Sequence, residues 1–136
     1  MASIYKEVLI EANPDALWAA LRDVGNVHRL FPGVLTNARL EGDTRVVTFA
    51  GGQVARERIV ALDDERRRVA YGVVRDGLVH HSASMQVFAD GAGCSSFVWI
   101  SDFLPDDLMA AIRPRVEQGA AAIKRAMEDQ TRRSSG

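Results

Sequence analysis

The sequence predicts an α+β fold: a curved, seven-stranded antiparallel sheet wraps around one long C-terminal helix, and two short helices follow the first strand. Three observations support this prediction. The length of 136 residues suits one domain with its own core. Short β-rich segments fill residues 34–103 without any helix-length insertion. One long amphipathic helical pattern follows, over residues 106–129.

The N-terminal elements follow from composition and turn residues. Residues 3–11 have a β-rich composition and predict a strand. Asn13-Pro14-Asp15 then supplies a turn and a helix start, because proline is tolerated in the first helical turn. Apolar residues recur at spacings of three and four within residues 15–24, which predicts a short helix. A second helical turn is expected over residues 26–31, before Pro32-Gly33.

Six consecutive strands are expected next, because turn residues interrupt the β-rich region at regular intervals. The turn signals are Glu41-Gly42-Asp43, Gly51-Gly52, Asp63-Asp64-Glu65, Asp76-Gly77 and Asp90-Gly91-Ala92-Gly93. A sheet of this size needs a cover for one face, so we expect it to curl around the terminal helix. Pro114 predicts a kink or restart in that helix. The domain is expected over residues 1–130, with residues 131–136 as a disordered tail.

Composition argues against several classes of partner. The 17 basic and 18 acidic residues create no basic field, so we expect no nucleic-acid partner. The single Cys94 excludes an internal disulfide and a cysteine-based zinc site. We find no signal-peptide pattern, membrane-length apolar run, phosphate-binding glycine loop or metal-ligand spacing. The expectation is therefore a cytoplasmic protein without membrane insertion, metal or other cofactor.

The segment VHHSASMQVFA, residues 79–89, distinguishes its two histidines by alternation. Successive strand side chains point to opposite faces of a sheet. His81 therefore shares a face with apolar residues, whereas His80 shares a face with polar ones and is expected to be solvated. The apolar set is Val79, His81, Ala83, Met85, Val87 and Ala89. An imidazole among buried neighbours is either a functional group or a histidine satisfied by a local hydrogen bond.

The same alternation selects the other inward-facing residues. Glu57 is expected to face inward because Arg56 and Arg58 occupy the opposite face. The remaining inward candidates are Tyr71, Val73, Arg75, Phe97, Trp99, Ser101, Phe103 and, on the helix, Ile112, Val116 and Ala120. The turns predict a row of Glu57, Val73, His81 and Ser101, beside a row of Ile59, Tyr71, Ala83 and Trp99. Glu57 and His81 would then lie two strands apart, with backbones about 10 Å from each other.

This order of elements resembles the helix-grip fold of the START/Bet v 1-like (SRPBCC) superfamily, in particular its bacterial polyketide cyclase/dehydrase-like branch. The segment IEANPDALWAALRD at residues 10–23 resembles that branch's I-x-A-x-P-x-x-V-W-x-x-L-x-D opening. The other matching features are the Phe31-Pro32-Gly33-Val34 turn, Arg45, Gly51-Gly52, Glu57-Arg58-Ile59, the Asp63-Asp64 turn, Tyr71 and Trp99. The resemblance covers nearly the whole chain.

The resemblance implies a cavity between the sheet and the terminal helix that takes a small hydrophobic or aromatic carbonyl compound. It implies cofactor-free cyclisation, dehydration or isomerisation, with His81, Glu57 and Tyr71 as the catalytic candidates. The ligand-binding candidates are Arg75, Val73, Ala83, Met85, Phe97, Trp99, Ser101, Phe103, Ile112, Val116 and Ala120. The alternative is a non-catalytic lipid or small-molecule binding protein, and a cochaperone is a third possibility. A monomer and a homodimer are both compatible with the sequence.

Four of the candidate residues each have two interpretations. Tyr71 either donates a phenolic hydrogen bond to a ligand carbonyl or only packs its ring against neighbours. His81 either transfers protons or hydrogen-bonds to a neighbour such as Ser101. Glu57 is either a buried carboxyl with a raised pKa or the ion-pair partner of Arg45 or Arg75, and pairing is favoured. Arg75 either holds a ligand carboxylate or enolate oxygen, or lies in water at the rim of the cavity.

Overall fold

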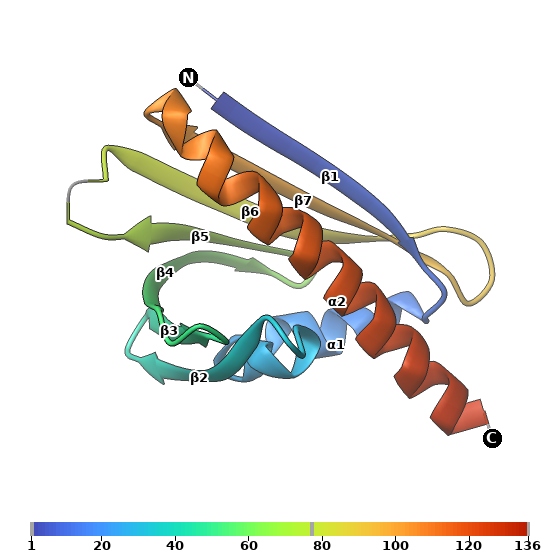
Figure 1. The fold of residues 1–136 in the computed structure, drawn as a ribbon. Helices are drawn as coiled ribbons and strands as arrows, with labels where there is room; N and C mark the ends of the chain where they lie inside the picture. Colours follow the sequence, from blue (N-terminus) through green and yellow to red (C-terminus); the bar gives the residue numbers. More distant parts are fainter. Residues whose placement is uncertain (1, 77, 136) are drawn as a thin grey trace.

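The structure is a computed structural model that describes residues 2–76 and 78–135. Its elements in chain order are β1 (Ala2–Ile10), α1 (Pro14–Arg22), the 3-10 segment η1 (Val24–Leu30), β2 (Leu35–Glu41), β3 (Thr44–Phe49), β4 (Val54–Asp63), β5 (Arg68–Val74), β6 (His80–Ala89), β7 (Ser95–Leu104), the 3-10 turn η2 (Asp106–Leu108) and α2 (Met109–Ser135) (Figure 1). This order confirms the predicted α+β architecture.

The seven strands form one antiparallel sheet in the order β1-β7-β6-β5-β4-β3-β2. Strands β2 to β7 follow one another as a meander, while β1 pairs with the last strand, β7. Figure 1 shows the sheet curving round, with α2 running diagonally across it and α1 near the β2 and β3 end. The helix-grip arrangement predicted from the sequence is therefore present.

The first helix is positioned by its cap and by an indole hydrogen bond. The Asn13 side chain accepts a hydrogen bond from the Asp15 backbone at the start of α1, and Pro14 occupies the first turn. Trp18 is buried, and its Nε1 donates to Asp64 over 2.9 Å. Arg22 donates to the same carboxylate over 2.7 Å. These contacts join α1 to the turn between β4 and β5.

The terminal helix is longer than predicted. α2 continues through Pro114 as one helix and extends to Ser135. Most of the segment expected to be a disordered tail is therefore helical in the structure. Thr131 Oγ1 donates to the Met127 carbonyl, and Arg132 pairs with Asp129 one turn earlier. Basic residues in a last helical turn also interact favourably with the helix dipole, which explains why a polar composition did not end the helix.

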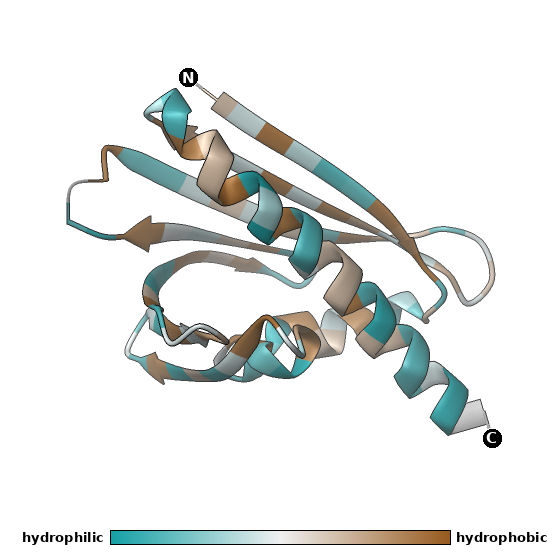
Figure 2. Cartoon of the chain, viewed as in Figure 1, coloured by the Kyte–Doolittle hydropathy of each residue, from teal (hydrophilic) through white to brown (hydrophobic). Residues whose placement is uncertain are grey.

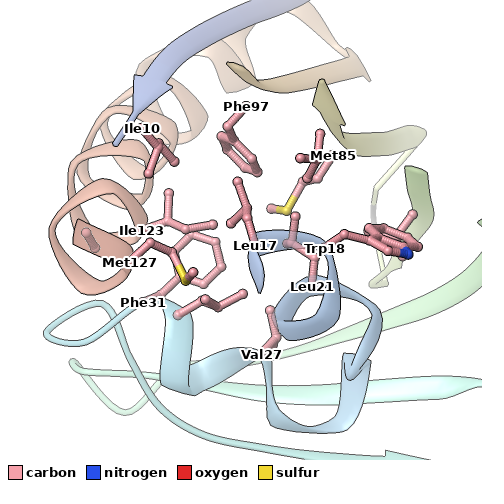
Figure 3. Packing of buried hydrophobic residues seen from close by; sticks show 14 of the residues in the cluster. Ile10, Leu17, Trp18, Leu21, Val27, Phe31, Met85, Phe97, Ile123 and Met127 are labelled. Atoms are coloured by element: carbon pink, nitrogen blue, oxygen red, sulfur yellow. The ribbon is translucent and has the colours of Figure 1, made fainter. Parts of the chain in front are cut away.

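The core has two parts. The larger lies between α1, η1, the C-terminal half of α2 and the sheet, where Leu17, Phe97 and Ile123 point toward one another (Figure 3). The smaller contains Ile4, Phe103 and Val116, under the N-terminal half of α2. The half-buried Trp99 packs against both parts. Hydrophobic and hydrophilic bands alternate along α2 (Figure 2), as expected for a helix with one buried face.

The predicted strand registers hold from β4 to β6 but not between β6 and β7. Glu57 pairs with Val73, and Tyr71 pairs with Ala83, as predicted. Ser101, however, lies opposite Ala83, and His81 lies opposite Phe103, so the row that joined His81 to Ser101 was wrong.

The cause of this error lies in the β6–β7 turn. Ala89 pairs with Ser95, and the chain reverses through the intervening residues because Gly91 and Gly93 adopt φ values of 76° and 73°. Relative to the predicted register, β7 is therefore shifted along β6 toward the turn that joins them. The difference is two residues, and side chains alternate with a period of two, so each residue keeps its predicted face.

Candidate active and ligand-binding site

A cavity of about 380 Å³ lies between the concave face of the sheet, η1 and the N-terminal half of α2. This volume falls within the usual range for small-molecule sites. Most of the wall is apolar or aromatic: Val27, Phe31, Val34, Leu35, Phe49, Val54, Ala55, Tyr71, Val73, Val74, Leu78, Met85, Trp99, Leu108, Ala111, Ile112, Val116 and Gly119. The polar groups on the wall are Arg45, Gln53, Glu57, Arg75, His81, Ser101 and Arg115.

A buried ion pair forms part of the cavity wall. Arg45 and Glu57 lie directly opposite each other on β3 and β4. Arg45 Nε donates to Glu57 Oε1 over 2.8 Å, and the two side chains are only 3% and 13% exposed. Arg45 Nη1 also donates to the Val24 carbonyl, over 3.5 Å. Of the two partners considered for Glu57, the structure therefore shows Arg45.

Tyr71 lies against this ion pair. The Arg45 guanidinium carbon is 5.1 Å from the centre of the Tyr71 ring, a cation–π distance. Burial raises the pKa of the Tyr71 phenol above its usual value, and the negative charge of Glu57 raises it further. The phenol is therefore protonated at neutral pH and acts as a hydrogen-bond donor rather than as a base.

The Glu57 carboxyl is subject to opposing effects. Burial raises its pKa, and this effect outweighs the charge of Arg45 and the hydrogen bond from Arg45. One carboxylate oxygen of Glu57 accepts the hydrogen bond from Arg45, and the side chain lies on the cavity wall.

His81 is half-buried on the cavity wall. Its ring packs edge-on against Phe103, with ring centres 5.9 Å apart. Burial lowers the pKa of the His81 imidazole, and the positive charges of Arg75, His80 and Arg115 lower it further. Within the described residues, no hydrogen bond occupies the His81 ring. His81 is therefore a neutral imidazole at neutral pH, with a nitrogen available as a proton acceptor.

Trp99 forms the floor of the cavity between two other aromatic residues. Its ring centre lies 5.9 Å from that of Phe31 and 6.3 Å from that of Phe97. The indole N–H lies near enough to the Tyr71 phenol to lower the pKa of that phenol, but no described residue is a partner of the buried Nε1 within hydrogen-bond geometry. A buried N–H group without a hydrogen-bond partner is costly.

Gly119 allows α2 to pass close to Trp99. A Cβ atom at position 119 would lie 2.7 Å from Trp99 Cζ3 and 2.9 Å from Cη2, which is closer than real contacts. A side chain at this position would therefore displace the indole and change the shape of the cavity floor.

Gly119→Ala is expected to disturb this contact. Glycine-to-alanine changes inside a helix normally stabilise by roughly 1 kcal/mol, but the overlap with Trp99 opposes that gain. We expect no increase in the free energy of unfolding, together with a changed Trp99 emission maximum, measured by urea titration and fluorescence. Gln118→Ala, at the exposed neighbouring position, is the control and leaves the emission unchanged. A gain of roughly 1 kcal/mol with unaltered emission in Gly119→Ala would contradict the prediction.

The structure brings most of the predicted site residues to the cavity wall. These are Glu57, Tyr71, Val73, Arg75, His81, Met85, Trp99, Ser101, Ile112 and Val116. Ala83, Phe97, Phe103 and Ala120 are instead buried in side-chain packing and do not line the cavity. Alternation identified the correct face for the three strand residues, and helical spacing did so for Ala120, but neither period shows how far along an element the cavity extends.

Several wall residues were not predicted as site residues, including Arg45, Phe49 and Arg115. Arg45, Val47 and Phe49 alternate along β3, so the rule applied to the other strands would have placed Arg45 and Phe49 inward. Arg115 follows Ile112 by three residues, the spacing of one helix face. Its guanidinium lies 4.4 Å from the centre of the Phe49 ring, a contact that only the tertiary structure creates.

Within residues 2–76 and 78–135, no cluster of three or more His, Cys, Asp or Glu side chains is arranged to hold a metal ion. Among the helices that the structure describes, none combines the length and apolar character needed to span a membrane.

Comparison with solved structures shows close similarity in fold. The XoxI protein from Bacillus cereus superimposes with a TM-score of 0.85 at 18% identity, covering 96% of this chain and 99% of that one. Norcoclaurine synthase from Thalictrum flavum gives a TM-score of 0.72 at 17% identity, covering 96% and 92%. Major latex-like protein 151 from Panax ginseng gives 0.76 at 16% identity, covering 93% and 97%. At these identities the similarity shows the fold alone.

The family of the chain is identified by comparison of its sequence with family models. No curated protein matches the chain. The family described as polyketide cyclase/dehydrase and lipid transport matches residues 1–133, which is nearly the whole sequence. The observed sheet, the terminal helix and the cavity between them are consistent with this match. The chain therefore belongs to the polyketide cyclase/dehydrase and lipid transport family.

Proposed function

We propose that the protein binds a small aromatic or otherwise hydrophobic carbonyl compound and catalyses its cofactor-free cyclisation, dehydration or isomerisation. One observation carries this proposal: a neutral imidazole, His81, and a protonated phenol, Tyr71, line the same mostly apolar cavity. One of the similar structures, norcoclaurine synthase, was determined in complex with dopamine and hydroxybenzaldehyde, two small aromatic compounds.

The two groups are spaced to act on one small molecule. Tyr71 pairs with Ala83, and His81 lies two residues further along β6 on the same face. The Cα atoms of such diagonal neighbours are about 7–8 Å apart. A compact carbonyl compound placed between them would have its oxygen near the Tyr71 phenol and an adjacent C–H group near the imidazole.

The proposed chemistry begins with proton removal beside the carbonyl. His81 takes a proton from the α-carbon, the electron pair of that C–H bond forms an enolate, and the enolate oxygen accepts a hydrogen bond from Tyr71. The Trp99 Nε1–H is a second donor available to that oxygen. Protonated His81 then returns the proton to another carbon in an isomerisation, or to a departing hydroxyl in a dehydration. Glu57 acts through Arg45, which it holds against the Tyr71 ring.

Binding is testable because one of the two tryptophans lies in the cavity and the other does not. We expect 2-tetralone, a small neutral aromatic ketone, to quench Trp99 fluorescence in the wild type and in Trp18→Phe. Trp18 is bound to Asp64 away from the cavity wall, so its removal should preserve the response. Trp99→Phe should lose the saturable quenching. Equal quenching in both variants would place binding elsewhere.

Catalysis is tested by α-proton exchange, the simplest reaction that the proposed mechanism permits. 2-Tetralone in D₂O would be followed by NMR, with loss of the α-proton signal compared with that in buffer alone. Acceleration by the wild-type protein supports the enzyme. Saturable binding without acceleration would instead support the non-catalytic alternative.

That alternative, a lipid or small-molecule binding protein, is favoured by the state of Glu57. Its carboxylate is engaged by Arg45, which reduces the number of groups free for chemistry, and the wall is otherwise mostly apolar. In such a protein, changes to the aromatic wall would weaken binding, while changes to His81 would have little effect.

A further inference from the structure

We propose that the natural ligand carries an anionic group, such as a carboxylate, which Arg75 and Arg115 bind at the solvent-exposed end of the cavity. This inference rests on the proposed function, because it requires the ligand to occupy this cavity. It goes further by specifying the chemical class: a compound with an apolar body and one anionic end.

The charges on the wall do not balance. Arg45, Arg75 and Arg115 line the cavity, and Glu57 is the single carboxylate among the described lining residues. Arg45 and Glu57 neutralise each other over 2.8 Å. Two positive charges, those of Arg75 and Arg115, are therefore left without a negative counterpart on the wall.

Arg115 is held in place at the cavity without an acid. Its guanidinium packs 4.4 Å from the centre of the Phe49 ring, which joins α2 to the end of β3. A cation–π contact of this kind orients the guanidinium while leaving its N–H donors unused. Arg113, two residues earlier on α2, is also exposed but does not line the cavity.

Arg75 reaches the cavity from the sheet, whereas Arg115 reaches it from α2. Arg75 follows the end of β5 and lines the wall beside Val73 and Val74. Within the part of the chain that the structure describes, neither Arg75 nor Arg115 forms an ion pair. Guanidinium groups bind carboxylates through paired N–H donors, so two exposed arginines without ion pairs on the wall of one cavity make a suitable anion site.

Arg75 and Arg115 both act electrostatically on His81. Both positive charges contribute to the lowered pKa of this imidazole, although one comes from the β5 end and the other from α2. An anion bound between them would therefore lie near His81, while the apolar body would extend toward Tyr71 and Trp99. Such an anion would offset the arginine charges and raise the pKa of His81, because ligand binding and protonation are reciprocally linked.

The test compares 2-naphthoate with 2-naphthamide, which have the same aromatic body and differ in charge. Affinities would be measured by titration calorimetry for the wild type, Arg75→Gln, Arg115→Gln and the control Arg113→Gln. We expect the wild type to bind 2-naphthoate about tenfold more tightly than the amide. Arg75→Gln and Arg115→Gln should each weaken naphthoate binding by roughly five- to tenfold while leaving naphthamide binding within about twofold.

Arg113→Gln removes the same charge from the same helix, so unchanged affinities in this variant separate direct contact from a general field effect. Equal affinity of the wild type for both compounds, or equal losses in Arg113→Gln and Arg115→Gln, would overturn the inference but leave the proposed function standing. Failure of both compounds and of 2-tetralone to quench Trp99 would overturn the proposed function, and this inference with it. As a second readout, 2-naphthoate should raise the pKa of His81 in NMR titrations, and 2-naphthamide should not.

Discussion

His81→Ala is expected to slow α-proton exchange in 2-tetralone by about 10²–10⁴-fold, the usual contribution of a positioned general base. The His81 imidazole is neutral at neutral pH because burial and nearby cations lower its pKa, and it lines the cavity without a hydrogen bond to the described residues. Its removal deletes the proton acceptor and leaves the phenol and the apolar wall in place. The rate would be measured by NMR in D₂O, with circular dichroism to verify the fold.

His80→Ala is the matched control. His80 is the neighbouring residue on the opposite face, is exposed, and contacts the Ser82 hydroxyl over 3.1 Å. The exchange rate should therefore stay within about twofold of the wild type. Wild-type exchange in His81→Ala would remove His81 from the mechanism and favour a binding protein.

The lowered pKa of His81 also sets a direction for pH dependence. The native state resists protonation of His81 more than the unfolded state does, so its stability contribution is complete above the usual histidine pKa of 6.5. That contribution is lost as the pH falls through the lowered native pKa. The exchange rate should fall in the same range, because protonated His81 cannot accept a proton. His81→Ala should abolish both dependences, and their persistence would assign them to another group.

Glu57→Ala is expected to lower the free energy of unfolding by about 3–5 kcal/mol, because it leaves the Arg45 guanidinium buried without its partner. The Arg45 side chain is 3% exposed and its Nε donates to Glu57, so water cannot replace the carboxylate without rearrangement. Loss of this amount is a large fraction of the stability of a small domain. Urea unfolding at neutral pH measures it directly.

The double variant Arg45→Met/Glu57→Leu separates two quantities. One is the net contribution of the ion pair to the free energy of unfolding, and the other is the penalty of leaving Arg45 buried without its partner. Replacing a buried pair with apolar residues of similar volume is often neutral or stabilising, so most of the lost stability should return. A second comparison uses Glu41, whose exposed carboxylate pairs with both Arg39 and Arg56, and Glu41→Ala should lower the free energy of unfolding far less than Glu57→Ala. If Glu57→Ala were equally mild, Arg45 would not depend on Glu57 for its burial.

Local rules predicted most of the architecture. Turn residues and β-rich segments located all seven strands, and apolar spacing located α1 and α2. Alternation separated His81 from His80 and placed Glu57 and Tyr71 on the concave face. These features depend on the chain within a few residues, where strand and helix periods determine which face a side chain occupies.

Only the tertiary structure decided which of the inward-facing side chains meet. The β6–β7 register depended on the backbone conformation of Gly91 and Gly93, and it separated His81 from Ser101. The Arg45–Glu57 pair formed instead of an Arg75–Glu57 pair because β3 and β4 place the first two residues opposite each other.

The sequence by itself thus determined the order of the elements and the face on which each candidate residue lies. The tertiary structure decided the depth of the cavity, the fit of Gly119 against Trp99, and the position of Arg115 over Phe49. The physical reason is the distance along the chain over which each interaction acts. Periodicity is a local property of the backbone, whereas packing and ion pairing depend on distances between segments that the sheet and α2 bring together only on folding.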